Sequence, residues 1–340
     1  MSISCGRAIQ SLNLIVSYDI IVKPPYQLSP VIFSLATSIA EKLGVIKSGS
    51  LQYPRAALRK DNQIKTIQST LAIEGNSLNL KQVTALLENK RVLAPLKDIL
   101  EVKNAIAVYE QLGLLDPFRL SSFLKAHKQM MQGLVKSAGA FRSGGVGIVK
   151  GTKLEHLPPP AARVKPLMKD LFSYLKNDSD PLLIKSCVFH YEMEFIHPFA
   201  DGNGRMGRLW QTVILSHYHQ VFAYLPVEQV VKNRQPDYYK ALRKADQAGH
   251  STPFIEFMLA AIDEALEQLL EQKQPPLSAE ERVIVYKTVS TQPAFTRKQY
   301  MGYFRMLSTA TASRDLQLAV QKRIVKRKGD KRTAIYSFLK

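Results

Sequence analysis

Helical periodicity in the first 270 residues is the feature that most constrains this chain. Apolar residues recur there at the three- to four-residue spacing of a buried helix face. The segments with this spacing are 61–74, 98–112, 119–133, 164–176, 181–196, 205–219 and 254–271. In the first segment Ile64, Ile67 and Leu71 share one face, and Gly75 follows as a natural C-terminal stop. The sequence therefore predicts a mainly α fold.

One stretch departs from this pattern. Residues 144–149 read Gly-Gly-Val-Gly-Ile-Val, a glycine-rich and β-branched run, and Pro158, Pro159 and Pro160 lie just beyond it. Glycine and proline punctuate turns, whereas valine and isoleucine favour strands. We therefore expect a short β-hairpin inside the helical region.

A different pattern begins after a polar, proline-containing linker at 272–276. Capping boxes at Ser278/Glu281 and Thr296/Gln299 predict helices over about 279–290 and 297–304. A third helix is expected over about 310–321, followed by basic strands around a Gly329-Asp330 turn. Three helices and a basic hairpin resemble a winged helix-turn-helix, so 277–340 is expected to be a separate domain.

Composition excludes several classes of protein. The chain has 340 residues, of which 46% are hydrophobic and 22% charged, as in a soluble globular protein. Its apolar runs are too short for a transmembrane helix, and its start makes a poor signal peptide, so we expect no membrane partner. The two cysteines, Cys5 and Cys187, form no CxxC motif. They exclude a disulfide scaffold and suit a reducing cytoplasm.

Positive charge is concentrated at the C-terminus. The net charge is +19, and residues 277–340 carry 14 Lys/Arg against 4 Asp/Glu. Thr309, Thr311, Ser313, Arg314 and the cations Lys326, Arg327, Lys328, Lys331 and Arg332 would face a phosphate backbone. Such clustering indicates a polyanion-binding module, with DNA as the candidate partner. A solvated basic surface or a protein-docking module would give the same pattern.

The segment His197–Arg208, His-Pro-Phe-Ala-Asp-Gly-Asn-Gly-Arg-Met-Gly-Arg, carries the chemistry. It joins two apolar helices, and Pro198 ends the first of them. Gly202 and Gly204 allow successive backbone amides to form an anion nest, to which the start of the next helix adds its own N–H groups. This loop is therefore a candidate phosphate site.

Charged side chains in the same loop support that interpretation. Arg205 and Arg208 lie in the first turn of a helix, where the dipole disfavours cations, so an anion between them would explain both. Asp201 offers a hard oxygen of the kind that Mg²⁺ takes beside phosphates. His197 supplies a base that titrates near neutral pH. Together they indicate phosphoryl or nucleotidyl transfer.

The loop has two alternative interpretations. Gly202, Gly204 and Gly207 formally match a dinucleotide-binding fingerprint, but a helix precedes them instead of a strand, so we reject a Rossmann site. The second alternative is an ordinary interhelical turn with surface arginines. It leaves the combination of base, acid, nest and two arginines unexplained.

At every fixed position the segment is similar to the active-site signature of the Fic family. Phe189-His190, Ile196 and the 139–160 region resemble the family as well, and the resemblance covers about residues 20–270. It implies an all-helical core with a β-hairpin flap, and transfer of AMP from ATP to a Ser, Thr or Tyr hydroxyl of a target protein, with the chain itself as one such target. The implied domains are an N-terminal helical region 1–112, a Fic domain 113–271 and a winged helix-turn-helix 277–340.

The resemblance also implies roles for individual residues. His197 would be the catalytic base, Asp201 would hold Mg²⁺ or Mn²⁺, and Arg208 would grip the γ-phosphate. Phe199 is better explained as core packing, and Tyr239 would line the nucleotide base or be a core tyrosine. The full set of implied ATP contacts is Glu74, His197, Gly202, Asn203, Gly204, Arg205, Met206, Gly207, Arg208 and Tyr239.

Glu74 is a second anomaly, because it ends a helix where the dipole disfavours an anion. Its segment, Thr70-Leu-Ala-Ile-Glu74-Gly-Asn, resembles the inhibitory motif of Fic proteins and precedes the signature in the chain. The resemblance implies an N-terminal inhibitory helix whose Glu74 pairs with Arg208 and occupies the γ-phosphate position. The alternative is a solvent-exposed glutamate at a helix end.

Several functions stay open at this stage. An autoinhibited, cytoplasmic protein adenylyltransferase is favoured. A DNA-binding regulator whose Fic fold senses nucleotide is the main alternative, although a sensor would not need His197. Removal of AMP from a modified protein is a third possibility. The winged helix would also suit a homodimer.

Overall fold

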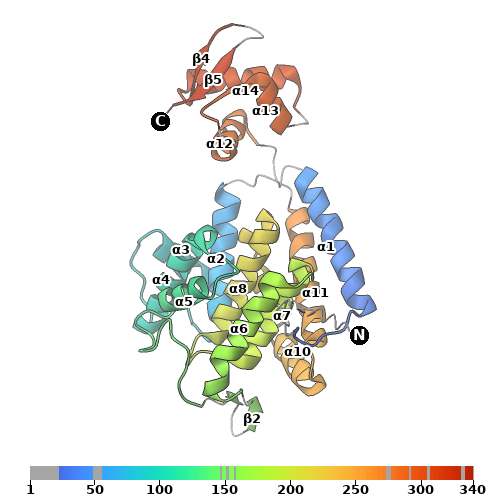
Figure 1. Ribbon diagram of the computed structural model, residues 1–340. Helices are drawn as coiled ribbons and strands as arrows, with labels where there is room; N and C mark the ends of the chain where they lie inside the picture. Colours follow the sequence, from blue (N-terminus) through green and yellow to red (C-terminus); the bar gives the residue numbers. More distant parts are fainter. Residues whose placement is uncertain are drawn as a thin grey trace, which may run out of the picture.

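The computed structural model describes residues 23–48, 56–145, 148–150, 153–156, 158–272, 277–290, 292–304, 307–330 and 334–339. Within these residues, no helix is long and apolar enough to cross a membrane. Helices predominate, as the periodicity predicts, and the secondary-structure elements belong to two groups with separate hydrophobic cores (Figure 1).

The first group contains eleven α-helices within the described residues. They are α1 (Pro30–Ser48), α2 (Ala56–Ile73), α3 (Leu80–Leu87), α4 (Leu96–Glu110), α5 (Leu120–Met130), α6 (Ala161–Asn177), α7 (Leu182–Ile196), α8 (Asn203–Tyr218), α9 (Val227–Asn233), α10 (Gln235–Ala248) and α11 (Thr252–Glu271), with short 3₁₀ helices at Leu112–Leu114 and Gln220–Ala223. All seven predicted helical segments coincide with helices of this set. The helices α1, α3, α9 and α10 were not singled out from the sequence.

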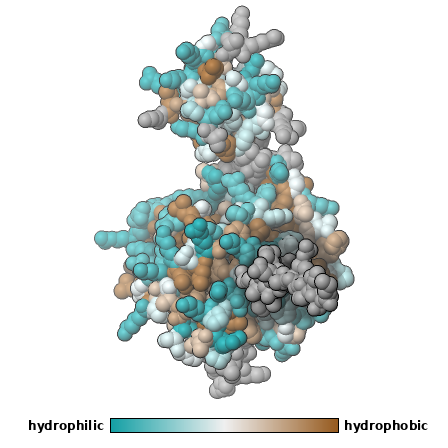
Figure 2. All heavy atoms as spheres, viewed as in Figure 1, coloured by the Kyte–Doolittle hydropathy of each residue, from teal (hydrophilic) through white to brown (hydrophobic). Residues whose placement is uncertain are grey.

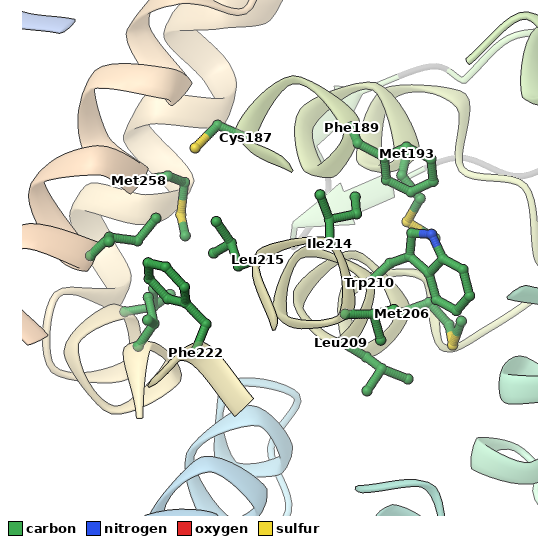
Figure 3. Packing of buried hydrophobic residues seen from close by; sticks show 14 of the residues in the cluster. Cys187, Phe189, Met193, Met206, Leu209, Trp210, Ile214, Leu215, Phe222 and Met258 are labelled. Atoms are coloured by element: carbon green, nitrogen blue, oxygen red, sulfur yellow. The ribbon is translucent and has the colours of Figure 1, made fainter. Parts of the chain in front are cut away.

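Helices α7 and α8 form the centre of this group. Helix α7 is apolar on nearly every side and is packed between α6, α8 and α11, as expected for a helix buried all round. Trp210 on α8 is fully buried, with its ring 5.0 Å from that of Phe123 on α5. Figure 3 shows Phe189 and Met193 of α7 facing Met206 and Trp210 of α8. The loop between the two helices is thus held by the best-packed part of the molecule.

Helix α2 packs against α4 and α9. Ile64, Ile67 and Leu71 are all buried, which confirms the predicted face. The helix ends at Ile73, one residue earlier than expected, so Glu74 lies in the following turn instead of in the helix. Gly75 then adopts a φ of +88°, a left-handed conformation that favours glycine.

The predicted hairpin is present. Strands β1 (Ile148–Lys150) and β2 (Lys153–His156) pair antiparallel, with an irregularity between Ile148 and Val149. Of the predicted glycine-rich run, Val146 and Gly147 lie outside the described residues. The hairpin lies between α5 and α6 in the chain, and Arg142 joins its base to the loop between α7 and α8 by donating to both Gly144 O and His197 O.

The second group consists of α12 (Ala279–Val289), β3 (Ala294–Thr296), α13 (Arg297–Tyr303), α14 (Thr309–Gln321), β4 (Val325–Lys328) and β5 (Ile335–Phe338). Both predicted capping boxes are formed. The predicted hairpin strands are β4 and β5, and β3, which was not expected, joins them to give the order β3-β5-β4. Residues 273–276 of the expected linker and 331–333 of the expected wing lie outside the described residues.

Polar side chains also fix this second core. Arg282 on α12 binds both carboxylate oxygens of the buried Asp315 on α14 at 2.7 Å, and the hydroxyl of Tyr300 donates to the same carboxylate at 3.1 Å. The visible face of this group is mostly hydrophilic (Figure 2). Lys326, Arg327 and Lys328 are exposed on β4. Three of the expected wing cations are therefore exposed, one of which, Arg327, pairs with Asp330, whereas Lys331 and Arg332 lie outside the described residues.

Candidate active site

The loop between α7 and α8 begins at His197, which has a left-handed backbone conformation (φ 49°, ψ 61°). A non-glycine residue rarely adopts this region, and such strain is typical of functional sites. The His197 amide still donates to Met193 O at 3.0 Å, which closes α7, and Pro198 then prevents the helix from continuing. The candidate base therefore stands at the point where the chain turns away from the central helix.

Asn203 holds this loop in shape. Its side-chain oxygen accepts from the Phe199 amide at 2.9 Å, and its side-chain nitrogen donates to Phe199 O, also at 2.9 Å. Both residues are buried, which confirms Phe199 as core packing. The side chain of Asn203, expected among the ATP contacts, is thus fully engaged in closing the loop.

Each glycine of the signature meets a different neighbour. A side chain at Gly202, whose φ is +85°, would meet Met131 Sδ at 2.6 Å. At Gly204 it would collide with the Glu74 carboxylate, and at Gly207 it would meet His190 Cδ2 at 2.7 Å, where α8 crosses α7. The glycine spacing therefore comes from close packing around a helix start, which accounts for the false match to a dinucleotide fingerprint.

The first turn of α8 presents its free amides at the loop. Met206 donates to Gly202 O at 3.0 Å, which is the first bond of the helix, so the amides of Asn203, Gly204 and Arg205 have no acceptor within it. The positive end of the helix dipole lies at the same place. This is the arrangement expected of an anion nest. The side chain of Met206 itself is buried in the core.

Arg208 is buried and faces the end of α2. Its Nε donates to Thr70 Oγ1 at 2.9 Å, and its Nη2 donates to Thr70 O at 3.1 Å and to Glu74 Oε1 at 2.6 Å. Burial by itself lowers the pKa of this guanidinium, but the Glu74 carboxylate holds that pKa above its ordinary value. The contact expected between Glu74 and Arg208 is therefore present in the structure.

The side chain of Arg205 binds different partners from that of Arg208. Its Nη1 donates to Glu101 Oε1 at 3.1 Å and its Nη2 to Asp201 Oδ1 at 3.0 Å. Arg205 is thus neutralised by Glu101 on α4 and by Asp201 in the loop, whereas Arg208 is neutralised by Glu74 in the turn after α2. The anion expected between the two arginines stays a prediction.

Asp201 was expected to hold a divalent cation. Its side chain is 52% exposed, and only Oδ1 is engaged, by Arg205 and by the Gly202 amide at 2.6 Å. In the described part of the chain, no three His, Cys, Asp or Glu side chains gather as a metal site. One exposed carboxylate fits Mg²⁺ bound mainly through substrate phosphates, the usual mode for this ion, and does not fit a resident metal.

Tyr239 lies partly buried on α10, with its ring 5.3 Å from that of Tyr238. Burial raises the pKa of its hydroxyl, and a hydrogen bond with Gln235 lowers it. The start of α10 adjoins the end of α2 beside Glu74, because the Gln235 side chain donates to Ile73 O at 3.0 Å. Both interpretations of this residue remain compatible with its position.

Three residues of the site were missed from the sequence. Glu101 is buried and accepts from Arg205 and from the Asn76 side chain at 2.8 Å. His127 stacks on Phe199 with centroids 3.5 Å apart and an interplanar angle of 4°. Arg142 is buried against the start of the loop. A charged or titratable residue within an apolar helix face is the only signal that could have pointed to Glu101 or His127.

The tautomer of His127 follows from its partners. Nδ1 accepts from the Gly139 amide at 2.8 Å, so Nε2 carries the proton and donates to Asp201 O at 3.0 Å. Burial lowers the pKa of His127 to about 4. The neutral ring therefore ties the loop at Asp201 to the segment that leads into the hairpin.

Comparison with known proteins agrees with this site. Residues 117–215, which include the whole loop, match the Fic/DOC family profile. A crystal structure of a Fic family protein from Desulfovibrio desulfuricans is 40% identical, covers 93% of this chain and 98% of its own, and superposes with a TM-score of 0.71.

Two curated relatives are more distant. The protein adenylyltransferase Fic of Nematostella vectensis is 28% identical over 243 residues, 68% of this chain and 53% of its own length. Protein adenylyltransferase fic-1 of Caenorhabditis elegans is 29% identical over 224 residues, 61% of this chain and 42% of its own length. The chain thus spans about half the length of these relatives. Sequence, loop geometry and the close structural match together place the chain in the Fic family.

Proposed function

We propose that this chain is a protein adenylyltransferase that transfers AMP from ATP to a Ser, Thr or Tyr hydroxyl of a target protein. The observation that carries the proposal is the α7–α8 loop, where His197, the exposed Asp201 carboxylate and the free amides of α8 adjoin the buried Arg208. The curated relatives named as protein adenylyltransferases support the same activity. The chemistry would take place in the Fic domain, residues 113–271.

In the proposed reaction, the target hydroxyl attacks the α-phosphorus of ATP. A new O–P bond forms, the bond between the α-phosphorus and the bridging oxygen breaks, and pyrophosphate leaves with that electron pair. His197 takes the hydroxyl proton, which raises the nucleophilicity of the oxygen. The amides of Gly204 and Arg205 bind phosphate oxygens at the positive end of α8, and Asn203 keeps them in place by fixing the loop.

Asp201 would hold Mg²⁺ or Mn²⁺ against the phosphates. The ion neutralises charge on the triphosphate when it is bound. Arg205 and the Gly202 amide orient the carboxylate by binding Oδ1, so Oδ2 would be the oxygen that holds the ion. Tyr239 is proposed to border the nucleotide base, because α10 adjoins the end of α2 beside Glu74.

We further propose that Glu74 inhibits this reaction. Its carboxylate lies where a side chain on Gly204 would be, directly over the start of α8, and it occupies the guanidinium of Arg208. A γ-phosphate that binds Arg208 must first displace it. Helix α2 would then be an inhibitory helix within an N-terminal region 1–112, and the structure would represent the inhibited state.

The C-terminal group of elements is a candidate winged helix-turn-helix domain, residues 277–340. Its exposed Lys326 and Lys328 on β4, together with Arg314 on α14, favour duplex DNA as a second partner. A protein partner or a second copy of the chain is the alternative to DNA, and the cytoplasmic location that we propose is compatible with each. Removal of AMP from a modified target remains the alternative reaction for the Fic domain.

Labelled ATP tests the proposal. The Glu74→Gly protein is incubated with Mg²⁺ and α-labelled ATP, alone and with whole-cell lysate, beside Glu74→Gly/His197→Ala. We expect labelled protein only where His197 is present, with ATP affinity similar in both proteins. Equal labelling without His197 would remove it as the base. Release of AMP from a pre-labelled target by the wild type, without transfer, would instead favour the reverse reaction.

A further inference from the structure

Arg142 is a buried cation whose bonding partners in the described structure are all backbone carbonyls. It is 6% exposed. Its Nε donates to His197 O at 2.7 Å, its Nη1 to Gly144 O at 2.9 Å, and its Nη2 to Pro159 O and to Ile196 O at 3.3 Å. Buried charges are usually paired with an opposite charge, because desolvation is costly. Because no carboxylate offsets this cost among the described partners, we attribute the role of Arg142 to the geometry of its guanidinium, which can bind several carbonyls at once.

The four carbonyls come from three segments that are distant in sequence. Ile196 and His197 end α7 and begin the signature loop. Gly144 and Pro159 lie on either side of the hairpin formed by β1 and β2. The planar fork of arginine binds both sides of the hairpin and the turn at His197 with one rigid group, which a lysine could not do.

The main chain reinforces this junction. The Arg142 amide donates to Pro198 O at 2.9 Å, so residue 142 binds three successive carbonyls of the turn, at 196, 197 and 198. The guanidinium also adds positive charge at the C-terminal end of α7, where the helix dipole favours it. Its attachment stabilises the unusual left-handed conformation of His197.

We propose that Arg142 is a positioning residue that sets the hairpin in register with His197. This inference rests on the proposed function, in which a target hydroxyl must reach His197 and the hairpin is the flap that Fic proteins use to hold the target; what it adds is the role of Arg142. Strand pairing along β1 or β2 would fix the backbone of the target, and Arg142 would fix the distance from that backbone to the base. Nucleotide binding, which depends on α8, would not need Arg142.

The test uses the full chain in the Glu74→Gly background. Arg142→Lys keeps the charge but loses the fork, and Arg163→Lys makes the same change at an exposed site on α6. We expect Arg142→Lys to lower AMP transfer to protein at least tenfold while Mg²⁺-ATP affinity, measured by calorimetry, changes less than twofold. Arg163→Lys should change neither.

Unchanged transfer in Arg142→Lys would overturn the proposal. So would a parallel loss of transfer, ATP affinity and melting temperature, because that pattern describes a merely structural residue. Amide hydrogen exchange provides a second measurement that does not depend on AMP transfer. Arg142→Lys should speed amide exchange by tenfold or more both at 142–145 and at 197–199, while exchange in α8 stays unchanged. Faster exchange at only one of these two segments would contradict the proposal that Arg142 couples the hairpin to the turn. If Glu74→Gly itself transfers no AMP, the proposed function fails. Hydrogen exchange would still decide whether Arg142 joins the hairpin to the turn at His197.

Discussion

Glu74 Oε1 accepts a hydrogen bond of 2.6 Å from Arg208 Nη2, although the two residues are 134 positions apart. The guanidinium is buried, whereas the side chain of Glu74 is 32% exposed. Arg208 is also held by both oxygens of Thr70, one turn earlier on α2. The end of α2 is therefore fastened to the second turn of α8 by Arg208, and only the outer bond of that attachment, the one to Glu74, is open to a competing anion.

Two substitutions of Glu74 should raise AMP transfer to different extents. Glu74→Gly removes both the competing charge and its bulk, so we expect AMP incorporation to rise roughly tenfold or more, since about 1.4 kcal/mol of lost inhibition is a factor of ten. Glu74→Gln keeps the bulk and should give a smaller rise. The measurement is labelled-AMP incorporation at saturating Mg²⁺-ATP. Glu88→Gly, a surface carboxylate that also follows a helix, is the control, and equal incorporation by folded Glu74→Gly and wild type would rule out inhibition by Glu74.

Replacing Glu101 should destabilise the protein strongly. Glu101→Gln leaves the buried Arg205 without the charge of its α4 partner, and breaking a buried pair in this way costs about 3 kcal/mol of unfolding free energy. Because Glu101 also accepts from Asn76, the turn after Glu74 should loosen as well. Urea denaturation measures the first effect. Glu110→Gln, an exposed change on the same helix, should shift stability by less than about 0.5 kcal/mol, and a similar small shift for Glu101→Gln would show that the pair contributes little.

His127 should make stability depend on pH. Its pKa in the folded state is about 4, below the ordinary 6.5, so the unfolded chain takes up a proton more readily between these values. The resulting stabilisation, about 3 kcal/mol, is complete above about pH 6.5 and is lost as the pH falls toward 4. Thermal melts from pH 4.5 to 7.5 should show a flatter pH dependence for His127→Gln than for wild type. His217→Gln, at an exposed histidine, is the matched control, and parallel curves for all three proteins would contradict the prediction.

DNA binding by the C-terminal elements should depend steeply on salt. Each phosphate neutralised by a lysine releases a counterion, so the full chain should bind duplex DNA with an affinity that falls as salt rises. Lys326→Ala and Lys328→Ala should each reduce the slope of log affinity against log salt by about 1. Fluorescence anisotropy at several salt concentrations measures this, with the exposed Lys165→Ala on α6 as control. No binding at low salt would leave a protein partner as the better candidate.

The short helices show why part of the fold could not be predicted. Periodicity located α2, α4 to α8 and α11, each of which repeats its apolar face several times, but it missed α1 and α10 although they have 19 and 14 residues. Helices α3 and α9 have 8 and 7 residues, so each offers barely two turns of pattern. Strand β3 has 3 residues and exists because β5 pairs with it, a contact that its own residues do not encode.

The sequence by itself determined those features of the fold that depend only on residues close together in the chain. The capping boxes at Ser278 and Thr296 and the stop at Gly75 follow from local backbone chemistry, and the signature loop resembles the family over twelve consecutive residues. The helix after this loop was also predicted, although it begins at Asn203, two residues before the predicted start. It also indicated that Glu74 and Arg208 lie at helix ends where their charges are unfavourable. The helix dipole therefore suggests that each of these two side chains needs a partner of opposite charge.

Only the tertiary structure decided which partners were chosen. Arg205 and Arg208 are three residues apart and look alike in sequence, yet one binds Glu101 and Asp201 and the other binds Thr70 and Glu74. Arg142 has no local feature that marks it, because its partners are carbonyls, which every residue possesses. The physical reason is that a hydrogen bond or ion pair between distant segments depends on how helices pack, and packing is set by the whole core at once.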